Sequence, residues 1–369
     1  MKNKPLVSLI IPVYNDAEFL HESLDSAVNQ TLKNIEIICV NDGSTDNSLE
    51  IMNEYAAKDS RVRVINRTEN GSALMARKDG IAAANGDFTM FLDGDDSLVP
   101  NACETAYNLI VKNDVDILQF SFISYHCAKD GNILYTIVRN PSFDEMILGR
   151  DRIQNFYFLE NQANLDSYLW NKIYKTKLLT RSHSKIDNFN CFFLNDLYEY
   201  YYILYYAKNM IGISTEPLYT YYRGRGVTGD NKISLKQFEK LCQANQAVNR
   251  IKKFLEHEGI FEEQKKYLSV WRKKRVQHYY HIGCKRLKAE DFDQAVKIMY
   301  SYFNEKDDAE EITLNLLTQL RNHVDWNKNL AASKIQIEDK NARIKELQDW
   351  NAEQLKAKEW FLSQIANKD

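Results

Sequence analysis

The first 120 residues alternate between short apolar runs and segments whose apolar residues recur at helical spacing, and this alternation constrains the fold most. The runs are rich in β-branched residues and apolar at nearly every position, as expected of strands buried on both faces. These predicted strands cover residues 7–14, 35–42, 62–67, 88–94 and 116–122. The predicted helices between them cover residues 17–31, 45–59, 72–85 and 100–113. Strands that alternate with helices form a mostly parallel sheet, so the sequence predicts an α/β domain with helices flanking the sheet.

Polar side chains follow four of the predicted strands at the point where each strand ends. The four clusters are Tyr14-Asn15-Asp16, Asn41-Asp42-Gly43-Ser44, Asn66-Arg67 and Asp93-Gly94-Asp95-Asp96. Because the carboxyl ends of parallel strands lie at one edge of a sheet, we expect these clusters to converge. Ligands of open α/β sheets bind outside that edge. The sequence therefore predicts a binding site assembled from the four clusters.

The stretch "FLDGDDSLVP" at residues 91–100 places three carboxylates, Asp93, Asp95 and Asp96, within four positions. Like charges this close repel one another in a partly buried site unless a cation or hydrogen bonds compensate. An EF-hand calcium loop is disfavoured, because Leu98 stands where its sharp turn needs glycine. Solvated loop acids are the simplest alternative. A Mg²⁺ or Mn²⁺ ion shared with a diphosphate fits better, because Asp42 ends a neighbouring strand and such ions keep only one or two carboxylates.

The composition is that of a globular protein. The chain has 369 residues, of which 44% are hydrophobic and 27% charged, so it is long enough for two domains. A net charge of -3 provides no overall attraction for nucleic acid. The six cysteines include no C-x-x-C pair, which favours reduced thiols in a cytoplasmic protein. No segment approaches the roughly 20 apolar residues of a membrane span.

Beyond residue 122 the pattern is less regular. The tyrosine-rich stretch "DLYEYYYILYY" at 196–206 is compatible with a helix or a strand, and residues 216–230 predict a strand that ends in a basic loop. From about residue 232 the pattern is helical and ends in an amphipathic stretch with partial heptad spacing. We therefore expect an α/β domain at 1–230, with halves 1–122 and 123–230. A helical domain at 231–330 and a C-terminal amphipathic helix at 331–369, with a short coiled coil as an option, would follow.

Three stretches and their spacing resemble the family 2 glycosyltransferases, which are inverting enzymes with a GT-A fold that include enzymes of bacterial surface-glycan synthesis. The stretches are "VSLIIPVYND", "NQTLKNIEIICVNDGSTDNSLEI" and "NGSALMARKDGIAAANGDFTMFLDGDD". The resemblance covers residues 5–125 closely and residues 165–230 more loosely. It implies a Rossmann-like GT-A domain followed by an α-helical C-terminal region.

The resemblance also implies a nucleotide pocket at the strand ends. Pro12, Val13 and Tyr14 match the residues that line the nucleobase pocket. Asp42 matches the aspartate that accepts a hydrogen bond from the base. Arg77 matches a basic residue near the nucleotide, and the lysine that follows it is a neighbouring candidate.

The acidic motif takes its role from the same resemblance. Asp93, Gly94 and Asp95 match the Asp-x-Asp motif, which contacts the ribose and a Mn²⁺ or Mg²⁺ ion. Asp95 and Asp96 are the candidate metal ligands. A general base must accept the proton of the acceptor hydroxyl, and Asp196 matches that base. A helix start at Asp196 favours its ionised form, although a purely capping role is the alternative.

Two further stretches match the second half of the family's domain. Trp170 and Asn171, in "SYLWNKIYKTKLL", are candidates for the acceptor side, with core packing as the alternative. Arg223 and Arg225 lie on the glycine-rich loop and would close over the diphosphate, with solvated loop arginines as the alternative. In the family's acidic pair at the base, Asn195 of this chain replaces the usual glutamate.

The resemblance implies a hexosyltransferase that moves a sugar from a nucleotide-sugar, with UDP-hexose favoured, to a hydroxyl of a glycan, glycolipid or glycoprotein. Processive synthases of the family carry transmembrane helices and a Gln-x-x-Arg-Trp motif, which this sequence lacks, so transfer of one or a few sugars is expected. A lipid-linked acceptor would involve peripheral membrane contact, for which "WRKKR" at 271–275 is a candidate. The C-terminal helix is a candidate homo-oligomer contact.

Two rival interpretations come from other classes of protein. A sugar-1-phosphate nucleotidyltransferase would need a glycine-rich basic loop after the first strand, and "PVYNDAEF" contains none. A catalytically inactive nucleotide-sugar-binding or scaffold subunit is suggested by Asn195. The retained carboxylates argue against that alternative, and they are Asp42, Asp93, Asp95 and Asp196.

Overall fold

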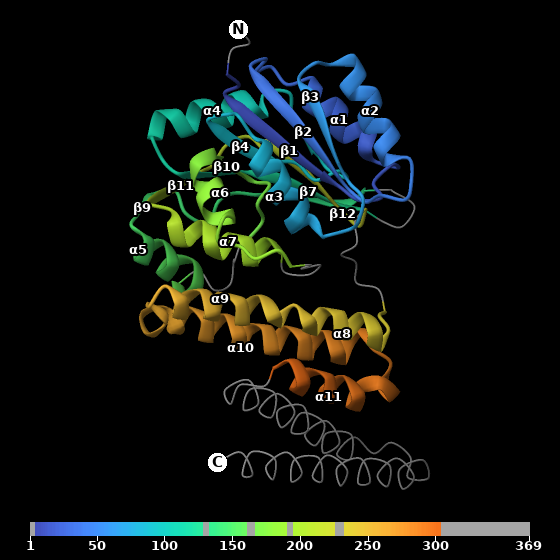
Figure 1. Cartoon of the computed structure of the whole chain (residues 1–369), viewed down its shortest axis with the longest axis vertical. Helices are drawn as coiled ribbons and strands as arrows, with labels where there is room; N and C mark the ends of the chain where they lie inside the picture. Colours follow the sequence, from blue (N-terminus) through green and yellow to red (C-terminus); the bar gives the residue numbers. More distant parts are fainter. Residues whose placement is uncertain (1–3, 128–132, 161–166, 190–194, 226–231, 304–369) are drawn as a thin grey trace, which may run out of the picture. The chain divides into compact units, whose positions relative to one another are not determined.

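The computed structural model of the protein describes residues 4–127, 133–160, 167–189, 195–225 and 232–303. The chain divides into two compact units, residues 1–272 and 273–369. The first unit contains the α/β part of the chain (Figure 1). The domain boundary expected after residue 230 stays a prediction.

Within the described ranges, eight strands form one sheet in the order β3-β2-β1-β4-β10-β6-β11-β9. In chain order their bounds are β1 Val7–Val13, β2 Ile35–Asp42, β3 Val62–Arg67, β4 Phe88–Phe91, β6 Ile117–Phe120, β9 Met146–Leu148, β10 Lys172–Lys175 and β11 Asn209–Ile213. Strands β1 to β4 pair in parallel, as do β6 and β11. Every residue of β1 and β2 is buried, which confirms strands enclosed on both faces. The predicted mostly parallel sheet is therefore confirmed.

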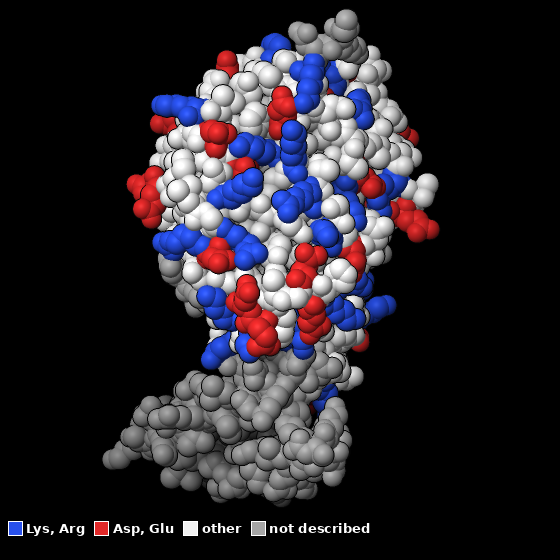
Figure 2. Space-filling model, turned by 60° about the vertical axis from the view of Figure 1, so that its left-hand side comes forward, with Lys and Arg blue, Asp and Glu red and all other residues white. Residues whose placement is uncertain are grey.

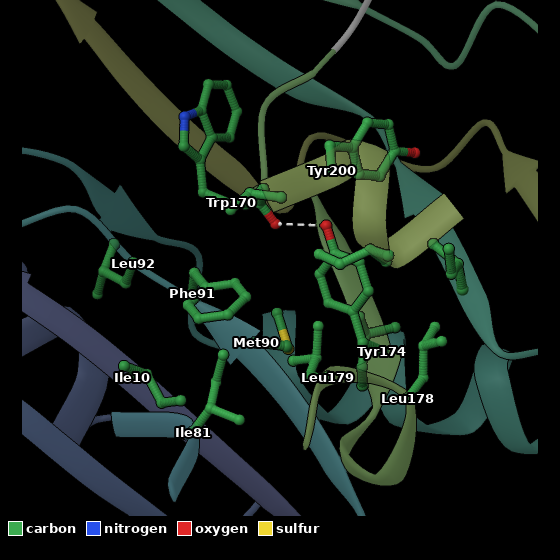
Figure 3. Packing of buried hydrophobic residues seen from close by; sticks show 14 of the residues in the cluster. Ile10, Ile81, Met90, Phe91, Leu92, Trp170, Tyr174, Leu178, Leu179 and Tyr200 are labelled. Carbon is green, nitrogen blue, oxygen red and sulfur yellow. Dashed lines mark hydrogen bonds between the residues drawn. The ribbon is translucent and has the colours of Figure 1, made fainter. Parts of the chain in front are cut away.

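Strand β10 is a departure from the parallel pattern. It lies between β4 and β6 and runs antiparallel to both. Its residue Tyr174 packs edge-on against Phe91 of β4, with ring centroids 6.0 Å apart, and donates its hydroxyl to the Leu169 carbonyl at 3.2 Å (Figure 3). This insertion brings the later part of the unit into the same core as the first four strands.

The four predicted helices of the first half are present. They are α1 Leu20–Val28, α2 Ser48–Lys58, α3 Ala73–Ala83 and α4 Ala102–Asn113. Helix α3 packs on β1 and β2, and it also contacts α6 Thr176–His183 and α7 Asn195–Tyr206. The stretch at 196–206 is thus a helix, and its residues from Leu197 to Tyr205 are all buried. These contacts bring α7 beside the first half of the unit.

A second sheet, counted over the same ranges, has the order β5-β12-β7-β8. Its strands are β5 Ser97–Leu98, β7 Phe122–Cys127, β8 Ile133–Arg139 and β12 Tyr219–Arg223. Strand β12, which confirms the strand expected within 216–230, pairs with β5 directly after the acidic motif. The second sheet therefore ties the acidic motif to a segment more than 100 residues further along the chain.

The helical pattern expected from residue 232 is confirmed as far as residue 302. The helices are α8 Leu235–Gln243, α9 Asn245–His257, α10 Phe261–Arg286 and α11 Phe292–Tyr302, preceded in the chain by short segments α5 Arg150–Gln154 and a π-helical turn Asn155–Glu160. Among the described helices none is long and apolar enough to cross a membrane. Within "WRKKR", Trp271 is buried, so membrane contact there stays a prediction. The C-terminal helix expected at 331–369 lies outside the described residues.

Charged side chains of both signs share the surface. On the face drawn in Figure 2, Lys and Arg side chains gather near the middle, with Asp and Glu side chains among and below them. The drawn face therefore carries no continuous patch of one sign. This mixture agrees with the small net charge of -3.

Candidate active site

The polar clusters at the ends of β1 to β4 lie at one edge of the sheet, as predicted. The parallel register of β2 and β3 sets Asn41 opposite Asn66, and Asp42 opposite Arg67. The loops after β1 and β2 are also joined, because Asn15 Oδ1 accepts a hydrogen bond from Thr45 N at 2.7 Å. Residues distant in sequence therefore form one polar surface.

Asp42 is held by partners on two sides. Its Oδ1 accepts hydrogen bonds from Arg67 Nε at 2.8 Å and Gly71 N at 2.9 Å. Burial raises the pKa of Asp42, while these two donors oppose the shift. A side chain at position 71 would put its Cβ 2.4 Å from Arg67 Nη2, so the glycine leaves room for the Arg67 side chain. The sequence places Arg67 at this edge but does not indicate its contact with Asp42.

The three residues expected to line the nucleobase pocket differ in exposure. Pro12 and Val13 are buried within β1, whereas the Tyr14 side chain just beyond the strand is 44% exposed. The backbone N–H of Tyr14 donates to Asp16 Oδ2 at 3.1 Å. Tyr14 therefore offers an accessible ring at the site edge. Contact with a base stays a prediction for all three.

Asp16 is a member of the acidic cluster that the sequence-based site omitted. A Cβ at position 94 would lie 2.5 Å from Asp16 Oδ2, so only glycine lets the Asp16 carboxylate lie this close to the backbone of residue 94. Burial and the nearby Asp95 charge raise the pKa of Asp16 to about 7. Its position in the cluster after β1 was the signal in the sequence.

Asp93 and Asp95 have the fewest hydrogen-bond donors among the carboxylates of the cluster. Burial, Asp95 and Asp196 raise the pKa of Asp93 to about 8, while Arg77 opposes this shift. Burial also raises the pKa of Asp95, while the Arg225 charge opposes this shift. Within the described residues, neither carboxylate accepts a hydrogen bond from another residue. A hard divalent cation would supply the positive charge that favours the ionised form of these two carboxyl groups, and their oxygens are not engaged by other donors of the described residues.

The described residues do not by themselves build a complete metal cage. Among them, no group of three or more His, Cys, Asp or Glu side chains is placed to hold a metal ion. Mg²⁺ and Mn²⁺ sites that bind nucleotides use one or two carboxylates and complete their coordination with phosphate oxygens and water. The donor set at Asp93 and Asp95 fits such a shared ion.

Asp96 has different surroundings from its neighbour Asp95. Its Oδ2 accepts a hydrogen bond from the Tyr219 hydroxyl at 2.7 Å, and its Oδ1 accepts one from Tyr222 N at 2.9 Å. Tyr219 Oη also accepts a hydrogen bond from Asp93 N at 3.2 Å. Asp96 therefore joins the acidic motif to β12, and its metal-ligand role stays a prediction.

Arg77 lies in the interior beside the predicted base. Its Nη2 donates to Asp196 Oδ1 at 2.7 Å, and its Nε donates to Glu199 Oε1 at 3.0 Å. The neighbouring Lys78 donates instead to the Ile186 carbonyl at 2.6 Å. Arg77 thus lies between the nucleotide half and α7, and direct contact with a nucleotide stays a prediction.

Asp196 lies at the start of α7, where the sequence places the base. Its backbone N–H donates to Asn195 Oδ1 at 2.6 Å, and 33% of its side chain is exposed. The position of Asp196 at a helix start predicts an ionised carboxylate. The pKa of Asp196 is instead raised, because burial outweighs the opposing Arg77 charge. A raised pKa makes the carboxylate a stronger proton acceptor.

The two predicted loop arginines differ in their contacts. Arg225 Nη1 donates to Glu22 Oε2 at 2.8 Å, and its guanidinium lies 3.5 Å from the centre of the Tyr222 ring. Arg223 is exposed at the end of β12. Gly224 between them has a φ of +115°, which favours glycine, whereas the rest of the glycine loop, residues 226–231, lies outside the described residues.

Trp170 and Asn171 are both buried. The Trp170 ring stacks on Tyr219 with centroids 4.3 Å apart and on Tyr168 at 4.7 Å. Asn171 Oδ1 accepts a hydrogen bond from Lys172 Nζ at 2.7 Å. This burial favours core packing, the alternative that the sequence left open, and contact with an acceptor stays a prediction.

The fold has known structural relatives. The crystal structure of S. aureus TarS 1–349 in complex with UDP matches with a TM-score of 0.55 and 18% sequence identity, covering 80% of each chain. The corresponding complex with UDP-GlcNAc matches with a TM-score of 0.53 and 18% identity, again over 80% of each chain. Together with the acidic edge of a mainly parallel sheet, this likeness defines a GT-A-like fold.

The family is defined by sequence. The profile described as "Glycosyl transferase family 2" matches residues 8–186. Residues 8–186 therefore carry a family 2 glycosyltransferase domain.

Individual relatives align over different lengths. Glycosyltransferase GlyG of Streptococcus pneumoniae is 37% identical over 132 residues, which are 36% of this chain and 44% of GlyG. The uncharacterized glycosyltransferase EpsJ of Bacillus subtilis is 34% identical over 50% of this chain and 52% of EpsJ. The cholesterol galactosyltransferase of Borreliella burgdorferi is 27% identical over 91% of this chain and 90% of that protein. The chain thus spans about half the length of GlyG and EpsJ.

Proposed function

We propose that the protein is an inverting hexosyltransferase that moves a sugar from a UDP-sugar to a hydroxyl of a glycan, glycolipid or glycoprotein. The observation that carries this proposal is the pair of carboxylates without hydrogen-bond donors, Asp93 and Asp95, at the same edge of the sheet as Asp42. A solvated acidic loop would not raise the pKa of Asp93 to about 8.

A divalent cation, Mn²⁺ or Mg²⁺, would be held by Asp95 together with Asp93. The ion would supply positive charge to the departing nucleoside diphosphate. Asp96 is the less favourable ligand of the three, because both of its oxygens already accept hydrogen bonds from β12. Arg225 would add a cationic side chain to the same region, since its Nη1 lies 3.5 Å from the Asp95 carbonyl.

Asp196 would accept the proton of the attacking hydroxyl. Its Oδ1 is engaged by Arg77, whereas within the described residues its Oδ2 accepts no hydrogen bond. The partly exposed side chain is thus accessible to an acceptor. A carboxylate with a raised pKa is suited to general-base catalysis near neutral pH.

The relatives support the choice of donor and acceptor classes. UDP and UDP-GlcNAc are bound in the TarS structures, which share the fold. One relative that aligns along nearly the whole chain is named as a cholesterol galactosyltransferase, so a lipid hydroxyl belongs in the panel of acceptors. The reduced cysteines expected from the sequence agree with work on the cytoplasmic side of a membrane.

A donor panel tests the proposal. The protein is incubated with Mn²⁺, glycan and lipid acceptors, and UDP-, GDP-, CDP- or dTDP-sugars, and the released nucleotide is measured. Turnover of a UDP-sugar that disappears with EDTA, with Asp95→Ala and with Asp196→Asn supports the proposal. Turnover that survives in both variants would refute the assigned roles. Sugar-nucleotide binding without turnover on any acceptor would favour the binding-subunit alternative.

A further inference from the structure

A buried charge network joins three helices behind Asp196. Glu199 of α7, Arg77 of α3 and His183 of α6 have side chains exposed by only 0%, 5% and 3%. Arg77 Nε lies 3.0 Å from Glu199 Oε1 and 3.1 Å from Oε2. His183 Nε2 lies 3.0 Å from Glu199 Oε2, and it must donate because a carboxylate accepts only. Glu199 is therefore held by two helices other than its own.

The network ends on the proposed base. The guanidinium of Arg77 is planar, so its contacts with Glu199 set the direction of its remaining N–H groups. One of these groups, on Nη2, donates to Asp196 Oδ1 at 2.7 Å. The other oxygen of Asp196 accepts no hydrogen bond within the described residues. Arg77 thus orients the carboxylate and leaves one oxygen for an acceptor proton.

Helical spacing explains why Glu199 can take part. Residues three apart on a helix lie on the same face, so Asp196 and Glu199 both reach Arg77. Asn195 occupies the place of the acid that usually precedes the base, but it has no charge to offer Arg77. Its side chain accepts the backbone N–H of Asp196 instead. A buried carboxylate is nevertheless present, one helical turn further along the chain.

We propose that Glu199 and His183 are positioning residues, which hold Arg77 so that it orients the Asp196 carboxylate for proton transfer. In this chain Glu199 supplies the acidic partner that Asn195 cannot supply. The inference rests on the proposed function, in which Asp196 is the base. Neither Glu199 nor His183 touches the reacting atoms, so each would act only through Arg77.

Crystal structures of variants test the geometry without an activity assay. In Glu199→Gln, Arg77 loses its charged partner, and the distance from Arg77 Nη2 to Asp196 Oδ1 is expected to lengthen beyond hydrogen-bond range. An unchanged contact of 2.7 Å would overturn the proposal. Should Glu199→Gln fail to fold, the double variant Arg77→Met with Glu199→Met removes both buried charges together, which proteins tolerate better. In it, a changed Asp196 side-chain conformation is expected, and an unchanged one would overturn the proposal.

Kinetics test the consequence for the reaction. With the donor from the panel above, Glu199→Gln is expected to lower kcat by roughly 10- to 100-fold, the usual effect of a misplaced catalytic group. The dissociation constant for UDP in Mn²⁺ should not change. His183→Gln, which keeps an N–H donor, should retain activity, whereas His183→Leu should lose it. Equal activity of the two His183 variants, or an equal loss of UDP binding and kcat, would indicate a purely structural role.

A matched control distinguishes an effect that is specific to this network from the general effect of replacing a buried glutamate. Glu36 is also buried, accepts hydrogen bonds from Ser8 and Asn85 and pairs with Arg63, but it lies on β2 away from the acidic edge. Glu36→Gln should lower the melting temperature and leave kcat unchanged. Absence of turnover in the unmodified protein would contradict the proposed function, while the crystallographic distances would still decide whether Glu199 positions Asp196.

Discussion

Asp95 and Asp96 are neighbours in the chain with opposite surroundings, and replacing each by alanine should change stability in opposite directions. Asp96 is 1% exposed and accepts hydrogen bonds from Tyr219 and Tyr222. Asp95 accepts none from another residue, and its charge raises the pKa of both Asp93 and Asp16. Asp96→Ala is therefore expected to destabilise the protein, and Asp95→Ala to stabilise its metal-free form.

The size of the first effect follows from the donors left without an acceptor. The Tyr219 hydroxyl is fully buried, while Tyr222 is only partly buried, so its N–H regains water more easily. A buried unsatisfied donor costs about 1–3 kcal/mol, which suggests about 3 kcal/mol for the two together. For a unit of 272 residues that equals a fall in melting temperature of about 4–6 °C. Removing one repelling charge at Asp95 should stabilise by on the order of 1 kcal/mol.

The assay is thermal unfolding in EDTA at pH 8, followed by calorimetric titration of UDP with and without Mn²⁺. Asp95→Ala should melt at or above the unmodified protein and lose the Mn²⁺ dependence of UDP binding. Asp96→Ala should melt lower and keep that dependence. Equal melting temperatures, or an Asp96→Ala variant that loses Mn²⁺ dependence while Asp95→Ala keeps it, would contradict the different surroundings of these two residues.

Three further predictions concern the same region. The pKa values of Asp16 and Asp93 rise from 3.8 to about 7 and about 8, so the folded protein binds more protons than the unfolded chain within that window. Stability of the metal-free protein should therefore fall as pH rises from about 4 to 8, and a melting temperature that increases over this range in EDTA would contradict this. Trp170→Ala should lower the free energy of unfolding by about 3–5 kcal/mol, because it leaves a cavity beside the buried ring of Tyr219. Urea unfolding measures this change, and a loss under about 1 kcal/mol would argue against that packing. Gly94→Ala places a Cβ 2.5 Å from Asp16 Oδ2, so it should weaken Mn²⁺-dependent UDP binding, and unchanged binding by calorimetry would show that this approach has no role in the site.

The strands of the first half could be predicted closely because burial on both faces leaves a sharp pattern. The expected strands at 35–42 and 62–67 coincide with β2 Ile35–Asp42 and β3 Val62–Arg67. Their polar ends could be placed together as well, since parallel strands share one carboxyl edge. The acidic edge of the site was therefore accessible from sequence.

Strand β10 and helix α7 show where local pattern is insufficient. The four residues Lys172–Lys175 are too few to show a period, and their strand conformation depends on hydrogen bonds with β4 and β6. In α7 nearly every residue is buried, so the tyrosine-rich stretch carries no polar face that would mark a helix. Tertiary neighbours decided both elements.

The candidate site likewise combines features that local sequence pattern predicts with contacts that depend on the tertiary structure. Local residue pattern was sufficient to predict the parallel sheet and the acidic edge at Asp93 and Asp95, because these depend on residue type and short spacing. Only the tertiary structure decided which carboxylates have partners. Asp96 is bound by Tyr219 and Glu199 by Arg77, pairs separated by 123 and 122 residues. No local pattern encodes such pairs, since they exist only once the strands and helices have packed and removed water from the charges.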